Sequence, residues 1–360
     1  MRRILSFLVI ILLCSQFGCA QMHTVDTQRM IHAAGFDMSK KQEFQGTILY
    51  PEYTHGVNTK PKTQTTTAIS LETITSRLNA KSPHNIVVGQ MRVVLFGKSF
   101  GTYGIGEIVN NLQRNPNIGR DVQLALVDGS SKKLLQHVKT HGSLYLADLL
   151  EQNVRNETIP RTALNLFLYD YYSKVRDPFL PYISIDKDQA VSVKGLAFLK
   201  KDKVVMYTDN QGSFLVKLLM NPTKNGRYEV PIRKGKHKGL VVIQNLSGKS
   251  IYQVNNMDHT AKARIRLKLN GLITSSPNWM NLTNKKNISF IRKQVENTLK
   301  KQAEQLIQEF QQKNIDPLGI CDEMRSRTRE WNIKEIRKMY PSTDIHVDVN
   351  VNIVQSGIGE

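Results

Sequence analysis

The stretch VVLFGKSFGTYGIG, residues 93–106, joins an apolar run to a glycine-rich turn and an amphipathic segment. This pattern predicts a buried strand, a tight turn and a helix that ends at Asn115-Pro116. Similar units surround it. A helix is predicted over residues 65–81, and VQLALVDG followed by SSKKLLQHV, residues 122–138, predicts a further strand and helix. Strands that alternate with helices are typical of layered α/β domains, so we expect this architecture in the N-terminal half.

Ser99 lies within Gly97–Gly101, which matches the G-x-S-x-G nucleophile elbow of serine hydrolases. A hydrolase would also need an acid, a later histidine and oxyanion donors from an earlier loop. Upstream, His55-Gly56 is a poor substitute for such a loop. The downstream histidines are His137, His141, His237, His259 and His346. Since the last falls in a segment that alternates like a strand, we favour a tight turn with no catalytic residue; the alternative is an exported serine esterase that uses Ser99.

Other motifs for cofactors fail on spacing. Gly97-Lys98-Ser99 resembles the end of a P-loop, but Arg92 stands where the first glycine should be. The glycines at 101, 104 and 106 are in the wrong order for a dinucleotide fingerprint. His137 and His141 could share a helix face, yet no acidic or cysteine partner lies nearby in the sequence, so we expect them to be exposed polar residues. The sequence therefore predicts no cofactor and no metal site.

The first eighteen residues have the pattern of an export signal. Arg2 and Arg3 precede an apolar run from Ile4 to Leu13, which is too short to span a bilayer comfortably. Gly18 stands before Cys19, as at the processing site of bacterial lipoproteins. Cys19 is thus the predicted lipidation site, as an S-diacylglycerol and N-acyl cysteine. The alternative is a plain secretory signal with an incidental cysteine.

Cysteine content and charge limit the remaining possibilities. Processing would remove Cys14 and leave Cys19 and Cys321, so we expect no disulfide and a small, buried Cys321. The signal holds two of the 50 Lys and Arg residues and none of the 30 acidic ones, which leaves the mature chain with a formal charge near +18. Export argues against nucleic acid as a partner, whereas an anionic lipid surface beside the anchor fits the charge. Alternatively, the lysines only keep the surface solvated.

The chain changes character near residues 178–189, PFLPYISIDKDQ, which we interpret as a hinge after a helix at 162–175. We divide the chain into a signal at 1–18, an N-terminal domain at 19–189 and a C-terminal domain at 190–360, within which 190–240 could form a subdomain of its own. The predicted fold class is α+β, a mixed α/β multidomain protein whose C-terminal domain combines a mixed sheet with one long amphipathic helix. The C-terminal elements expected are a hairpin at 190–209, a helix at 210–220, strands at 239–254 and 261–276, the long helix at 287–314, a short helix at 332–341 and a terminal strand at 344–354.

Several stretches, in this order, resemble the Ger(x)C proteins, the C subunits of spore germinant receptors. Gly-Cys and a short tether lead to MIHAAGFDMSKKQEFQGTILYP, and RVVLFGKSFGTYGIGEIVNNLQRNPNI follows. The hairpin GLAFLKKDKVV opens the second half, and an Asp-x-x-Gly turn, a tryptophan and an alternating strand close it in NIDPLGICDEMRSRTREWNIKEIRKMYPSTDIHVDVNVNIV. The chain departs from the family pattern at Ala20-Gln21, where Trp-Asp is usual, and at Cys321, where glycine is usual.

The resemblance implies a lipoprotein on the outer face of the spore's inner membrane. It also implies assembly with two integral-membrane subunits into a nutrient-sensing receptor, without enzymatic activity or a cofactor. A ligand-capturing lipoprotein that serves a transporter remains a further alternative.

Overall fold

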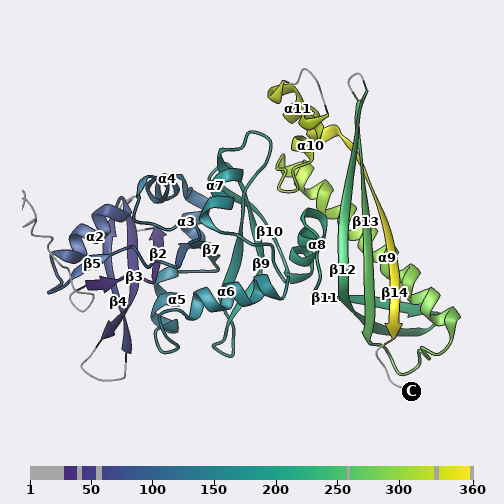
Figure 1. The fold of residues 1–360 in the computed structure, drawn as a ribbon, viewed down its shortest axis with the longest axis horizontal. Helices are drawn as coiled ribbons and strands as arrows, with labels where there is room; N and C mark the ends of the chain where they lie inside the picture. Colours follow the sequence, from purple (N-terminus) through teal and green to yellow (C-terminus); the bar gives the residue numbers. More distant parts are fainter. Residues whose placement is uncertain (1–27, 39–42, 54–58, 258–259, 328–331, 357–360) are drawn as a thin grey trace, which may run out of the picture.

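The computed structural model describes residues 28–38, 43–53, 59–257, 260–327 and 332–356. It contains an eight-stranded sheet in the order β10-β9-β8-β7-β6-β2-β3-β4, a four-stranded sheet in the order β11-β12-β13-β14, and a separate β1-β5 pair (Figure 1). The strands are β1 (Gln28–Met30), β2 (Ala33–Met38), β3 (Phe44–Tyr53), β4 (Thr59–Ala68), β5 (Asn85–Val87), β6 (Val93–Gly97), β7 (Gln123–Val127), β8 (Phe179–Ile185), β9 (Val191–Lys200), β10 (Lys203–Thr208), β11 (Arg227–Lys234), β12 (His237–Met257), β13 (Thr260–Ser275) and β14 (Asp344–Ser356).

Helices cover both faces of the eight-stranded sheet. Apolar side chains of α2, α3, α4 and α7 pack on one face, and those of α5 and α6 pack on the other. Within β6, Val94 and Phe96 face the first set while Val93 and Leu95 face the second, as expected of a central parallel strand. The helices of this half are α2 (Leu71–Asn79), α3 (Lys98–Tyr103), α4 (Gly106–Arg114), α5 (Ser131–Val138), α6 (Tyr145–Arg155) and α7 (Leu164–Tyr172).

The long helix α9 lies along the four-stranded sheet, and α8 lies between the two sheets (Figure 1). The buried stripe of α9 is Ile291, Val295, Leu299, Ala303, Leu306, Ile307 and Phe310. The ring of Phe310 meets that of Phe198 in β9, with centroids 4.8 Å apart, so one core is continuous from the larger sheet to the smaller. The helices of this half are α8 (Asn210–Met220), α9 (Lys285–Lys313), α10 (Ile320–Ser326), α11 (Ile333–Met339) and the 3₁₀ turn η2 (Tyr340–Ser342).

The structure confirms the α+β class and corrects three local expectations. The predicted hinge contains β8, which pairs with β7 and β9 inside the sheet; its prolines suggested a loop, but Pro181 is accommodated in the strand opposite Leu196. The predicted helix at 65–81 begins only at Leu71, because Thr59–Ala68 pairs with β3 and Ser70 caps the helix by accepting a hydrogen bond from the Thr73 amide. The apolar segment NIVVGQMRVVLFG, residues 85–97, has the pattern of one strand, but it forms two, β5 and β6. The domain division at residue 189 stays a prediction.

Candidate functional site

The turn around Ser99 is explained by packing. β6 leads directly into α3, and Ser99 lies exposed in the first turn of that helix. Gly97 has φ of −65°, which any residue can adopt, so its need for glycine is one of space. A β-carbon there would lie 2.0 Å from Asp37 Oδ1, and one on Gly101 would lie 2.4 Å from Leu126 Cδ1. Both glycines of the motif thus permit close approach by buried neighbours.

Asp37, at the end of β2, fills the position where an α/β protein often binds an anion. Its carboxylate accepts hydrogen bonds from the backbone amides of Ser131 and Lys132, each 2.8 Å long, at the N-terminus of α5. The hydroxyls of Ser130 and Ser131 also donate to it, at 2.9 and 3.0 Å. Since the positive end of the helix dipole is already met by this internal carboxylate, the helix start has a structural role.

The candidate histidines lie apart from Ser99. His137 Nε2 is 2.7 Å from the Gln189 carbonyl, and the His141 ring contacts Tyr145. His237 stacks near Trp279, and His346 lies in β14, 3.2 Å from Asp344. His259 lies outside the described residues. Within the part of the chain that the structure describes, no hydrogen bond joins Ser99 to a histidine, and no group of three His, Cys, Asp or Glu residues could hold a metal ion.

Lys98, next to the serine, is held in an ion pair. Its Nζ lies 2.9 Å from Asp128 Oδ1 and above the Tyr207 ring. Hydrogen bonds from Tyr182 and from Lys98 lower the pKa of Asp128, whereas burial followed by the contact with Asp128 raises the pKa of Tyr182 to about 12. The lysine of the P-loop-like tripeptide therefore forms an ion pair with the aspartate that directly follows β7.

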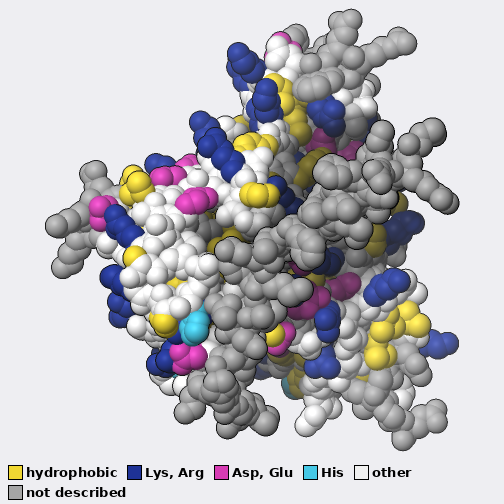
Figure 2. Space-filling model, turned by 60° about the vertical axis from the view of Figure 1, so that its left-hand side comes forward, with side chains coloured by type: hydrophobic (Ala, Val, Ile, Leu, Met, Phe, Trp, Pro, Cys, Tyr) yellow, Lys and Arg dark blue, Asp and Glu magenta, His cyan; other side chains and the backbone are white. Residues whose placement is uncertain are grey.

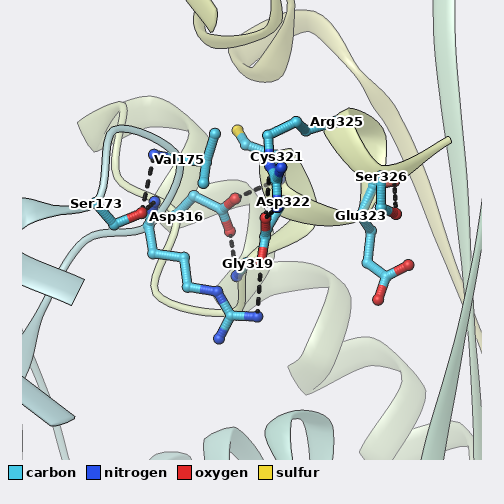
Figure 3. A network of polar contacts seen from close by, with 10 residues as sticks. Ser173, Val175, Asp316, Gly319, Cys321, Asp322, Glu323, Arg325 and Ser326 are labelled. Carbon is cyan, nitrogen blue, oxygen red and sulfur yellow. Dashed lines mark hydrogen bonds and ion pairs between the residues drawn. The ribbon is translucent and has the colours of Figure 1, made fainter. Parts of the chain in front are cut away.

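A buried polar junction joins the two halves of the chain, and Figure 3 shows its C-terminal side around Asp316. The chain leaves α9 through Asn314 in a left-handed conformation, and Asp316 follows, fully buried. The Asp316 carboxylate accepts hydrogen bonds from the amides of Gly319, at 2.9 Å, and Cys321, at 2.6 Å. Burial raises the pKa of Asp316 despite these donors. The Asp-x-x-Gly turn is thus closed by its own aspartate.

Asp177, at the end of the N-terminal half, completes the junction. Its Oδ2 accepts hydrogen bonds from the Asp316 amide and from Arg337 Nη1, each 2.7 Å long, and its own amide donates to the Asp316 carbonyl at 3.1 Å. Arg337 also donates to the carbonyls of Lys174, at 2.8 Å, and Arg176, at 3.1 Å. The Arg337 guanidinium of α11 therefore donates hydrogen bonds to two backbone carbonyls and one carboxylate in the segment that precedes β8.

Arg176 gives the junction a second ion pair. Its Nη2 lies 3.3 Å from Asp322 Oδ2, and Arg325 donates twice to the other oxygen of Asp322. Gly319, with φ of +78°, has no space for a side chain, because a β-carbon would lie 2.7 Å from Arg176 Cζ. This close approach explains the glycine of the Asp-x-x-Gly turn.

Asp170, at the end of α7, is a further carboxyl group at the junction whose pKa is raised. Burial raises its pKa to about 6, the carboxylates of Asp177, Asp316 and Asp322 act in the same direction, and Arg176 opposes them. Cys321 is a free, buried thiol, as expected, and burial raises its pKa well above the ordinary value. The junction carries more negative than positive groups, and its arginines hold it together.

Comparison with known proteins settles the family. Residues 21–185 match the model of the spore germination protein N-terminal domain, and residues 194–357 match the model described as spore germination B3/GerAC-like, C-terminal. The chain belongs to the GerAC-like family of spore germination proteins. The polar junction therefore joins the two segments that define this family, since Asp177 lies in the first and both Asp316 and Arg337 lie in the second.

Individual GerAC-like relatives cover most of the chain. Spore germination protein GerQC of Bacillus cereus is 28% identical over 357 residues, which are 98% of this chain and 99% of that protein. The putative spore germination protein YfkR of Bacillus subtilis (strain 168) is 21% identical over 293 residues, which are 79% and 76% of the two chains. The crystal structure of the GerBC protein has the same fold, with a TM-score of 0.58 and 16% identity over 89% of this chain and 96% of that one. Family and fold together support a germinant-receptor C subunit role in spore germination.

The GerAC-like assignment leaves the predicted anchor untested. Gly18 and Cys19 lie outside the described residues. Among the described residues, no helix is long and apolar enough to cross a membrane. Lys and Arg side chains are scattered among acidic and uncharged ones over the face drawn in Figure 2.

The sequence motifs did not predict this junction. The Asp-x-x-Gly turn was noticed in the sequence, but its partners Asp177 and Arg337 were not. The available signal was a repeated Asp-Pro dipeptide, at Asp177-Pro178 and Asp316-Pro317, each after a helical stretch. A hollow of about 830 Å³ was also missed; it lies between β5, α2 and the end of α4, beside Glu72, Asn79, Gln90 and Asn117.

Proposed function

We propose that this chain is a non-catalytic, lipid-anchored germinant-receptor subunit, held at the outer face of the spore's inner membrane through Cys19 and packed on two integral-membrane subunits. The observation that carries the proposal is the match of both family segments, in order, along a chain that begins with the export pattern and Gly18-Cys19. The buried junction supports it, because a rigid connection between the halves suits a subunit that binds other subunits.

The proposed anchor would keep the folded body close to the lipid. Gln28, where β1 begins, is nine positions after Cys19. Even a fully extended chain of that length reaches only about 30 Å. Because an S-diacylglycerol and N-acyl cysteine carries three acyl chains, it would suffice for stable attachment, and further contacts with lipid or with partner subunits would orient the folded body.

Metabolic labelling with a fatty-acid analogue tests the anchor. We expect label on the wild-type protein and none on Cys19→Ala, while Cys321→Ala, which removes the other mature cysteine, keeps its label. Label that survives Cys19→Ala, or a wild type without label, contradicts the anchor.

Co-purification tests the receptor assignment. The full chain, tagged at its C-terminus and extracted from spore membranes in mild detergent, is expected to bring down two integral-membrane proteins. Recovery of the chain alone under conditions that preserve other membrane complexes contradicts the assignment, as does recovery of transporter subunits instead.

A further inference from the structure

One face of the four-stranded sheet is covered by α9, and the opposite face is exposed. Along β13, alternate side chains from Ala261 to Leu269 are buried in the core. The residues between them point the other way and are all exposed; they are Lys262, Arg264, Arg266 and Lys268. Strand β13 thus presents four consecutive outward positions that are all cationic.

The register of the sheet adds neighbours to this row. Lys249 of β12 lies opposite Lys268, and Ile251 lies opposite Arg266. On the other side, β14 places Asp344 beside Lys262, His346 beside Arg264 and Asp348 beside Arg266. We call Lys249, Lys262, Arg264, Arg266 and Lys268 the basic strip. It carries five cations against the two carboxylates of Asp344 and Asp348, a formal excess of three.

Most of the strip has no internal counter-ion. Arg264 Nε lies 3.5 Å from Asp348 Oδ2, and both side chains are more than half exposed, at 55% and 53%. For Lys249, Lys262, Arg266 and Lys268, the described residues supply no ion pair within 4.0 Å. From Lys262 to Lys268 the strand advances about 20 Å, so the strip is long enough to meet several anionic groups at once.

We infer that the basic strip is a docking surface for anionic lipid headgroups. Charge complementarity favours lipid phosphate, because each Lys or Arg near an anionic membrane contributes about 1 kcal/mol. The composition argues against a protein partner, since cores of protein interfaces are depleted in lysine and enriched in aromatic residues. Among the described side chains of the neighbouring strands β12 and β14, the exposed large apolar ones are Leu240, Leu246, Ile251 and Val354, and none of them is aromatic. The inference rests on the proposed function only in taking a membrane to be nearby.

Vesicle binding by unlipidated protein tests the strip separately from the anchor. The chain that starts at residue 19 and carries Cys19→Ala keeps every described residue and cannot be lipidated. We expect it to sediment with vesicles containing about one-third phosphatidylglycerol, to bind phosphatidylcholine vesicles at least about tenfold less, and to lose binding as salt is raised.

Matched charge variants identify the surface. The strip variant combines Lys249→Gln, Lys262→Gln, Arg266→Gln and Lys268→Gln. The control combines Lys286→Gln, Arg292→Gln, Lys293→Gln and Lys301→Gln, which removes the same charges from the exposed side of α9. We expect at least about a tenfold loss of partitioning for the strip variant and less than about twofold for the control. The double variant Asp344→Asn, Asp348→Asn should bind anionic vesicles more strongly than the wild type. Provided that the variant is monomeric and its melting temperature is unchanged, misfolding would not explain such a gain.

The inference would be overturned if the strip variant and the control lost vesicle binding equally, or if the protein showed no preference for anionic vesicles. A co-purified protein that is lost only from the strip variant, while vesicle binding is unchanged, would assign the strip to a protein partner instead. The labelling of Cys19 does not depend on vesicle binding. If the vesicle experiment contradicts the basic strip, the proposed lipid anchor is unaffected, and if labelling contradicts the anchor, the vesicle result is unaffected.

Discussion

The Asp37 carboxylate occupies the space that a β-carbon on residue 97 would need, with Oδ1 only 2.0 Å from that position. The same carboxylate binds the start of α5 through two amides and two hydroxyls. The first glycine of the elbow-like motif therefore leaves space for an aspartate that is sixty residues away in the sequence and lies on the adjacent strand of the sheet.

Gly97→Ala should destabilise the protein strongly. The new methyl group would displace Asp37 and leave the amides of Ser131 and Lys132 without their acceptor. We expect a loss of about 2–4 kcal/mol in the free energy of unfolding, measured by urea denaturation. Gly129→Ala is not a suitable control because Gly129 has φ of +125°, whereas the exposed Ser99→Ala should change stability by less than about 0.5 kcal/mol. A tolerated Gly97→Ala would contradict the packing argument.

Ser99→Ala also separates the receptor from the esterase. Because the described histidines lie away from Ser99, we expect nutrient-triggered germination and the background hydrolysis of a chromogenic ester to be unchanged. Loss of hydrolysis in the variant, with normal folding, would revive the catalytic alternative.

Arg337→Ala should open the buried junction. It would remove one of the two donors to Asp177 Oδ2 and the positive charge that faces this carboxylate, at a cost of about 3–5 kcal/mol in a denaturation experiment. The exposed pair Arg155–Glu151 provides the control, since Arg155→Ala should cost less than about 1 kcal/mol. Comparable losses in the two variants would show that Arg337 contributes as an ordinary surface arginine.

Asp170→Asn should stabilise the protein at neutral pH and have little effect in acid. With a pKa of about 6 in the fold against 3.8 in the unfolded chain, Asp170 favours the folded state when protonated, and this contribution is lost as pH rises through 6. Asparagine does not ionise, so the variant does not lose this stability as the pH rises. The difference in unfolding free energy between variant and wild type should therefore grow from near zero at pH 4 to about 2–3 kcal/mol at pH 7.5. A difference that is constant with pH would contradict the assignment.

The exposed edge of β14 is protected by two glutamates of α9. Glu304 Oε1 accepts from the Val347 amide at 3.2 Å, and Glu296 Oε1 accepts from the Val351 amide at 2.9 Å. Replacing both by alanine should free these donors and promote edge-to-edge association, seen as a concentration-dependent increase in mass by light scattering. The Glu→Gln pair keeps an acceptor at each place and should remain closer to the wild type. Monomeric alanine variants would show that the glutamates are dispensable there.

The sequence predicted those elements whose periodicity was strong. The stripe of α9 and the alternation of β14 are both present, since one buried face imposes its period on the residues. Strand β4 was missed because Thr59–Ala68 is rich in threonine and lysine and owes its conformation to pairing with β3. Helix α3 was missed because it is a single short turn-and-a-half that follows glycine. The contacts of Asp37 with α5, and of Asp177 with Arg337, join residues about 94 and 160 positions apart, which no local pattern encodes.

The exchange of hydrogen bonds between Asp177 and Asp316 sets how the molecule can come apart. Each aspartate donates its amide to the other, and Arg337 forms an ion pair with the Asp177 carboxylate. Drawing the four-stranded sheet away from β8 would remove both donors of the Asp177 carboxylate at once and break the bond from the Asp177 amide to the Asp316 carbonyl, and it would expose the Phe198–Phe310 contact to water. We therefore expect both sheets to unfold on heating in one cooperative calorimetric transition. A force applied to either half would be transmitted to the other through this junction.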